Sequence, residues 1–109
     1  MTGPEIAAVV VAAGRGVRAG GGVPKQYRLL AGDLVLARTL KALLAVPEIG
    51  RIVVVIHPDD HALHALALSG IDDARVMAPV HGGASRQASV RAGLEALADR
   101  PPDIVLVHD

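Results

Sequence analysis

The sequence predicts an α/β fold in which a mostly parallel sheet carries helices on both faces. Three short apolar runs, IAAVVV at residues 6–11, RIVVVI at 51–56 and DIVLV at 103–107, have the aliphatic, β-branched content of buried parallel strands. Segments with helical spacing separate these runs, so strands and helices alternate along the chain. A length of 109 residues suits one small domain or one part of a larger domain.

The first half of the chain supplies two strands and two helices. Residues 6–11 form the first strand, and a glycine-rich loop follows it. Apolar residues then recur at helical spacing over 34–46, where Pro47 ends the helix. After the strand at 51–56, Pro58 and Asp59 suit the first turn of a helix that extends to about residue 68.

The second half continues the alternation with shorter elements. We expect a strand at 75–78, a glycine turn at His81-Gly82-Gly83, a helix over 85–98 and a last strand at 103–107. The chain stops directly after that strand, where a loop is expected. We therefore expect residues 1–109 to be a truncated part of a single longer domain, with its C-terminal half absent.

The composition excludes several classes of protein. Cysteine is absent, which rules out disulfides and thiolate metal sites, and the net charge of +0 argues against a general nucleic-acid binder. No apolar run approaches the about 18 residues of a membrane span, and the first residues lack a signal-peptide pattern. We expect a cytoplasmic protein with neither a membrane nor a nucleic acid as partner.

The loop VVVAAGRGVRAGGGVPKQYRLL, residues 9–30, concentrates glycine and positive charge. Arg15, Arg18, Lys25 and Arg28 lie in a stretch from residue 6 to 32 that contains no acidic residue. Glycines let a backbone approach a ligand closely, and arginine and lysine bind phosphate oxygens. The pattern favours a compact anion such as a triphosphate. The alternative is a flexible loop whose cations are only solvated.

Two well-known phosphate loops do not fit this stretch. The glycines from Gly14 to Gly20 are spaced G-x-G-x-x-x-G instead of the dinucleotide fingerprint G-x-G-x-x-G, and the strand at 51–56 does not end in an acidic residue. Gly22 stands where a P-loop requires lysine. What remains is the small-residue turn at 12–14, at the carboxyl end of the first strand, where open α/β sheets bind ligands.

Four motifs together resemble those of the 2-C-methyl-D-erythritol 4-phosphate cytidylyltransferase family of non-mevalonate isoprenoid biosynthesis. They are AAGRGVR at 12–18, PKQY at 24–27, GGASRQASV at 82–90 and VHD at 107–109, and they span the chain in order. The resemblance implies a Rossmann-like sheet of the nucleotidyltransferase type. It also implies a Mg²⁺-dependent homodimeric enzyme that joins CTP to a sugar-alcohol phosphate, forming CDP-methylerythritol and pyrophosphate.

The resemblance further implies roles for individual residues. Arg18 and Lys25 match the catalytic pair that stabilises charge on the phosphates, and Asp109 matches the carboxylate that holds Mg²⁺. Ala84 and Ala88 stand where the family commonly has polar or acidic residues near the base. The residues implied to contact CTP come from the two glycine turns: Ala12, Ala13, Gly14, Arg15, Gly16, Gly82, Gly83 and Ser89.

Other interpretations stay open at this point. A ribitol 5-phosphate cytidylyltransferase has a similar P-K-Q loop, and a non-catalytic nucleotide-binding module would need the same cradle. His57, His61 and His64 have the spacing of one helical face, but Pro58 starts the helix after the first of them, so we expect surface histidines here and no metal site. We expect Arg86 to tie the second glycine loop to its surroundings.

Overall fold

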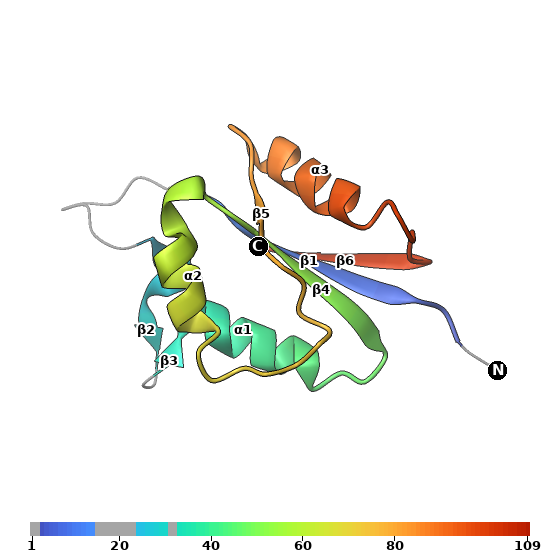
Figure 1. The fold of residues 1–109 in the computed structure, drawn as a ribbon, viewed down its shortest axis with the longest axis horizontal. Helices are drawn as coiled ribbons and strands as arrows, with labels where there is room; N and C mark the ends of the chain where they lie inside the picture. Colours follow the sequence, from blue (N-terminus) through green and yellow to red (C-terminus); the bar gives the residue numbers. More distant parts are fainter. Residues whose placement is uncertain (1–2, 15–23, 31–32) are drawn as a thin grey trace.

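A four-stranded parallel sheet forms the centre of the computed structural model, which describes residues 3–14, 24–30 and 33–109. The strand order is β5–β4–β1–β6, and β1 lies between β4 and β6 with Val9 opposite both Val53 and Val107 (Figure 1). Because all four strands are parallel, their carboxyl ends meet at one edge. The strands are β1 (Ile6–Ala12), β4 (Ile49–Ile56), β5 (Val80–His81) and β6 (Ile104–His108).

Helices cover both faces of this sheet, which confirms the predicted fold class. α1 (Val35–Leu44) and α2 (His61–Ala67) pack on one face, and α3 (Arg86–Ala96) packs on the other (Figure 1). Alternate residues of β1 and β4 point to the two sides, because side chains alternate along a strand. Val10 and Val54 therefore lie in the core beneath α1 and α2, whereas Val9, Val53 and Val55 lie beneath α3.

One strand differs from the expectation. The strand expected at 75–78 is reduced to a bridge between Val76 and Ile52, and the strand that continues the sheet, β5, begins at Val80. Ile52 exchanges hydrogen bonds with Arg75 and Met77 at this bridge, both of 2.8 Å. Pro79 has no N–H to continue the ladder, so the pairing is interrupted before β5.

Four short elements between β1 and α2 were not predicted as such. A 3₁₀ turn, η1 (Lys25–Tyr27), and an antiparallel hairpin of β2 (Leu29–Leu30) and β3 (Asp33–Leu34) lead into α1. The helix expected from residue 58 begins as a 3₁₀ turn, η2 (Pro58–Asp60), before α2. Each is too short to give a periodic signal, so sequence patterns could not locate it.

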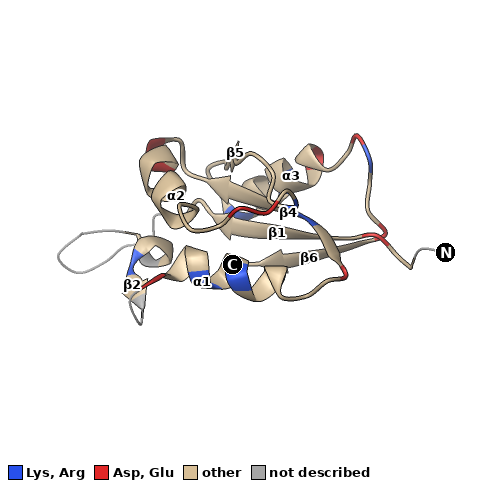
Figure 2. Ribbon diagram, turned by 60° about the horizontal axis from the view of Figure 1, so that its bottom comes forward, with Lys and Arg blue, Asp and Glu red and all other residues tan. Residues whose placement is uncertain are grey.

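The described surface carries charges of both signs. Basic and acidic residues are interspersed along the described elements (Figure 2). None of the helices in the part of the chain that the structure describes combines the length and the apolar character that crossing a bilayer requires.

Candidate functional site

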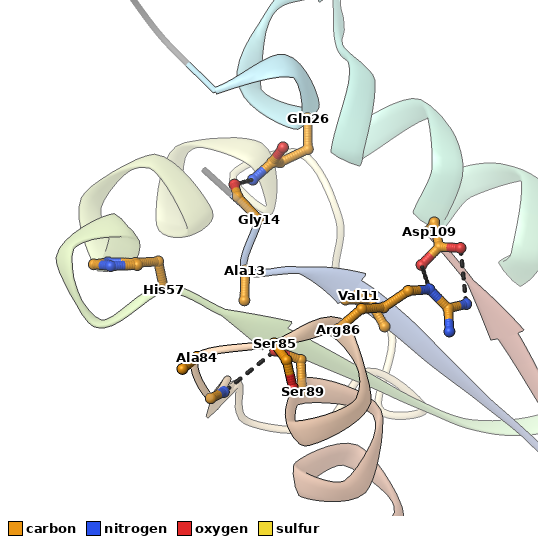
Figure 3. Close-up of a pocket in the computed structure, with 11 residues that line it drawn as sticks. Val11, Ala13, Gly14, Gln26, His57, Ala84, Ser85, Arg86, Ser89 and Asp109 are labelled. Atoms are coloured by element: carbon orange, nitrogen blue, oxygen red, sulfur yellow. Dashed lines mark hydrogen bonds and ion pairs between the residues drawn. The ribbon is translucent and has the colours of Figure 1, made fainter. Parts of the chain in front are cut away.

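A cavity of about 460 Å³ opens at the carboxyl edge of the sheet (Figure 3). Its lining comes from the end of β1, the residue after β4, the turn that precedes α3, the first turns of α3 and the residue after β6. Parallel α/β sheets bind their ligands at this edge, because the loops that leave the strands diverge there. The cavity therefore brings together segments that are distant in the sequence.

The end of β1 forms one wall of the cavity. Ala13 and Gly14 line it, and Ala12 lies behind them with 3% of its surface exposed. Gln26 of η1 donates from Nε2 to the carbonyl oxygen of Ala12 at 2.7 Å and to that of Gly14 at 3.4 Å. These bonds fix η1, and with it the backbone of Lys25, beside the end of β1.

The second glycine turn forms the opposite wall and packs too closely for any side chain. A Cβ on Gly82 would lie 2.5 Å from both Ala13 Cβ and Ser89 Oγ. A Cβ on Gly83 would lie 2.4 Å from Ala88 Cβ. Such distances are shorter than real Cβ contacts, so these positions require glycine to bring the turn against β1 and α3.

Ser89 holds the second glycine turn in place. Its side chain is buried, with 2% exposed, and its Oγ accepts a hydrogen bond of 3.2 Å from the backbone N–H of Gly83. Ser85 caps α3 in a similar way, since its Oγ accepts from the backbone N–H of Ala88 at 3.1 Å. The positive end of the α3 dipole thus faces the cavity, an arrangement that favours an anion there.

An ion pair closes the side of the cavity next to β6. Arg86 donates from Nε and from a terminal nitrogen to the two carboxylate oxygens of Asp109, both at 2.8 Å (Figure 3). This hydrogen bonding, followed by the charge of Arg86, holds the pKa of Asp109 below its usual range and raises the pKa of the guanidinium. Asp109 is therefore a carboxylate at neutral pH. Arg86 thereby ties the start of α3, close to the second glycine turn, to the end of β6.

The structure brings five of the sequence-predicted residues to this one cavity: Ala13, Gly14, Gly83, Ser89 and Asp109. Ala12 and Gly82 pack behind the lining. Arg15, Gly16 and Arg18 lie outside the residues that the structure describes, and of Lys25 only the backbone is described.

The cavity also contains residues that the sequence did not single out as functional. Gln26 of the PKQY motif and His57 both line it. His57 follows β4 directly, and its Nδ1 accepts from the backbone N–H of Asp59 at 3.0 Å. Its position immediately after a predicted strand was the signal that could have identified it.

The three histidines do not share one environment, which corrects the expectation of a surface group. His57 lines the cavity, His61 is exposed, and His64 is buried with 5% of its surface accessible. Burial lowers the pKa of His64, and the charge of His61 lowers that pKa further. Within residues 3–14, 24–30 and 33–109, no group of three or more metal-ligating side chains comes together.

Comparison with known proteins gives consistent matches over nearly the whole chain. The sequence model of 2-C-methyl-D-erythritol 4-phosphate cytidylyltransferase (IspD) matches residues 6–109. The chain is 55% identical over 101 residues to a bifunctional enzyme IspD/IspF of Paramagnetospirillum magneticum, covering 93% of this chain and 26% of that relative. It is 56% identical over 106 residues to the corresponding protein of Rhodopseudomonas palustris, covering 97% and 26%.

Solved structures agree with these matches. The 4-diphosphocytidyl-2C-methyl-D-erythritol synthase of Anaerococcus prevotii superposes with a TM-score of 0.79 at 32% identity, over 97% of this chain and 43% of that one. The Francisella tularensis 2-C-methyl-D-erythritol 4-phosphate cytidylyltransferase gives a TM-score of 0.69 at 28% identity, over 96% and 43%. The chain thus spans about a quarter of the curated relatives, at 26%, and less than half of these solved structures. It belongs to the 2-C-methyl-D-erythritol 4-phosphate cytidylyltransferase family.

Proposed function

We propose that residues 1–109 are the nucleotide-binding part of a cytidylyltransferase that transfers CMP from CTP to 2-C-methyl-D-erythritol 4-phosphate. The observation that carries the proposal is the cavity between the β1 turn and the Gly82–Gly83 turn. Two closely packed backbone walls suit a flat base and a ribose, and the N-terminus of α3 together with Arg86 suits an anion. Family membership supplies the reaction.

The reaction needs charge stabilisation more than it needs a covalent nucleophile. An oxygen of the acceptor phosphate attacks the α-phosphorus of CTP, a new P–O bond forms, and the bond to the departing pyrophosphate breaks. Two polyanions meet in this step, so positioned cations lower its barrier. We assign that role to Arg18 and Lys25. The wall of Ala12, Ala13 and Gly14, with the η1 backbone held by Gln26, supports CTP.

The described residues fit Mg²⁺ at Asp109. This cation takes one or two carboxylates together with phosphate oxygens and waters, and Asp109 is an ionised carboxylate on the cavity lining. Arg86 uses one lone pair on each carboxylate oxygen, and each oxygen retains a second. Bound Mg²⁺ would neutralise phosphate charge during transfer. Arg86 orients the carboxylate toward the cavity and keeps it deprotonated.

The same proposal includes the properties that family membership suggests for the complete enzyme. We propose a cytoplasmic homodimer whose acceptor is a sugar-alcohol phosphate. Arg15 and Gly16 would contact CTP from the first loop, and Gly82, Gly83 and Ser89 from the second. Ala84 lines the cavity, and Ala88 packs beside it against Gly83, so the two alanines offer no side-chain hydrogen bond to the base.

Calorimetric titration with CTP, UTP, ATP and NAD, each with and without Mg²⁺, tests nucleotide binding directly. We expect Mg²⁺-dependent binding of CTP in preference to the others, weakened by Lys25→Ala. Lys41→Ala is the matched control, because Lys41 lies on α1 and pairs with Asp33 at 2.7 Å, outside the cavity lining. In a pyrophosphate-release assay, removal of Arg18 or Lys25 should reduce the rate by about 10²- to 10³-fold.

The outcomes separate the alternatives. Equal binding of all triphosphates would indicate a phosphate cradle without base selection and would direct attention to Ala84 and Ala88. CTP binding without turnover would indicate a nucleotide-binding module, and turnover with ribitol 5-phosphate would reassign the acceptor. A preference for NAD, or no binding of any triphosphate by the folded protein, would contradict the proposal.

A further inference from the structure

Two exposed histidines from different elements face each other beside the second glycine turn. The Nε2 atoms of His61 and His81 are 2.7 Å apart, their ring centroids are 4.9 Å apart, and the ring planes meet at 72°. His61 is the first residue of α2 and His81 is the last residue of β5. The pair is outside the cavity lining and has no role in the proposed reaction.

The backbone fixes the approach of these two rings. His81 lies opposite Ile56 in the β4–β5 ladder, so it is held at the carboxyl end of β4. The chain leaves β4 through His57 and turns back within η2, which returns His61 to the same place (Figure 1). Both α-carbons therefore belong to hydrogen-bonded elements, and only the side chains need to adjust to a ligand.

We propose that His61 and His81 form a binding site for a divalent transition-metal ion such as Zn²⁺ or Cu²⁺. A metal about 2.1 Å from each Nε2 would lie about 3.2 Å from each ring centroid. The observed centroid separation of 4.9 Å then corresponds to an angle of about 100° at the metal. This angle lies between the square-planar and tetrahedral values, so the rings can accept the ion by tilting in place.

Imidazole chemistry determines which ions this site accepts. In the neutral pair one Nε2–H donates to the other Nε2, so the donor ring must move its proton to Nδ1 before both nitrogens can bind a metal. Borderline ions such as Zn²⁺ and Cu²⁺ prefer imidazole, whereas Mg²⁺ prefers oxygen. No third ligand gathers at the pair among the described residues, so water would complete the coordination.

The position of the site gives metal binding a structural consequence. Gly82 follows His81 directly, and its backbone N–H donates to the carbonyl oxygen of Ile56 at 2.9 Å. An ion on the histidine pair would therefore join the start of α2 to the Gly82–Gly83 turn. Because the ion binds only the folded arrangement, it should raise the melting temperature.

Zinc titration of the protein and two variants tests this inference. We expect saturable binding of one equivalent of Zn²⁺, a melting temperature that rises with Zn²⁺ but not with Mg²⁺, and an affinity at least about tenfold weaker in His61→Gln and in His81→Gln. His108→Gln is the control, because His108 is an exposed histidine on β6 outside the pair. Zn²⁺ affinity should also fall on acidification, since protons compete for the same nitrogens.

A spectroscopic measurement on the unsubstituted protein makes the test independent of how the variants fold. The electron paramagnetic resonance spectrum of bound Cu²⁺ should show two equatorial nitrogens. Coordination by one nitrogen or none, or equal Zn²⁺ affinity in the protein and in both folded glutamine variants, would overturn the proposal.

Discussion

The two faces of the sheet are packed in different ways. On the face of α1 and α2, large side chains fill the space, and Leu36, Leu40 and Ile52 are at most 1% exposed. On the face of α3, the helix approaches through small residues, with Ser89 and Gly93 buried against the strands. A Cβ on Gly93 would lie 2.5 Å from Val9 Cγ1.

Because of this difference, one face mainly determines stability and the other mainly determines the shape of the site. Burial of large aliphatic side chains contributes most of the hydrophobic free energy, and on the first face α1 and β4 provide it through Leu36, Leu40 and Ile52. Close approach of α3 buries less apolar volume, but it puts Ser89 and the second glycine turn at the cavity. We therefore expect substitutions on the first face to change the free energy of unfolding, and substitutions on the second face to change ligand binding as well.

The largest effect should come from Leu40→Ala on the first face. Leu40 is fully buried, so truncation should leave a cavity and lower the free energy of unfolding by about 2–5 kcal/mol. Nucleotide affinity of the remaining folded protein should not change, because Leu40 is not among the residues that line the cavity. Chemical denaturation measures the loss. Leu66→Ala is the control, since Leu66 is 59% exposed and its truncation should change stability by less than about 0.5 kcal/mol.

A smaller effect should come from Gly93→Ala on the second face, where the substitution adds side-chain volume instead of removing it. Alanine favours a helix by about 1 kcal/mol over glycine, but overpacking typically costs about 1–3 kcal/mol. The new methyl would meet the side chains of Val9 at 2.5 Å and Val55 at 3.1 Å, and these buried β-branched residues cannot rotate away. We expect a net loss of stability together with weaker CTP binding, because α3 must move away from the sheet.

The matched control for that substitution is Gly70→Ala. A Cβ at Gly70 meets nothing within 4 Å, so stability and CTP binding should both stay nearly unchanged. A Gly93→Ala protein that is more stable than the parent and binds CTP equally well would remove the proposed difference between the two faces.

The two faces were not equally predictable from the sequence. The aliphatic runs located β1, β4 and β6, and α1 followed from helical spacing, because burial leaves a periodic pattern. On α3, Leu94 is 42% exposed, and the buried stripe runs through Ser89, Gly93 and Leu97 at the C-terminal cap. Close packing selected small residues there, and a hydrophobic pattern does not register them.

The candidate site was likewise only partly predictable from the sequence. The turns at 12–14 and 82–83 were predicted because glycine and alanine mark close backbone approach at strand ends. Gln26 bonds to two carbonyl oxygens at the end of β1 that lie 14 and 12 residues earlier in the chain. Arg86 bonds to Asp109, which lies 23 residues later. Such pairings follow from how loops and helices are placed, and no local pattern encodes them.

Ser89→Ala should have a modest effect on stability and a clearer effect on the cavity. The substitution leaves the backbone N–H of Gly83 without its acceptor, and loss of one such hydrogen bond costs about 1 kcal/mol. The glycine turn should loosen, so CTP affinity should fall. Ser69→Ala is the control, because the Ser69 hydroxyl donates to Leu66 on the exposed surface. Equal CTP affinity in the two variants would show that the hydroxyl does not organise the turn.

The smallest predicted effect concerns His64, a buried polar residue of α2 on the large-residue face. Its folded-state pKa lies below the ordinary value of 6.5 because burial disfavours the charged ring. The unfolded chain therefore binds more protons as the pH falls through 6.5, and stability decreases on acidification. His64→Leu should flatten this decrease between about pH 7 and about pH 5, as measured by denaturation across that range.

The paired carboxylates Asp33, Asp73 and Asp109 cannot mimic the effect, because their pKa values are lowered from 3.8 and their contribution is lost only at more acidic pH. An unaltered slope in His64→Leu would mean that the unfolded and folded states titrate alike at this position. The large-residue face would then tolerate a polar ring without any dependence on its protonation, and its contrast with the α3 face would rest on side-chain volume alone.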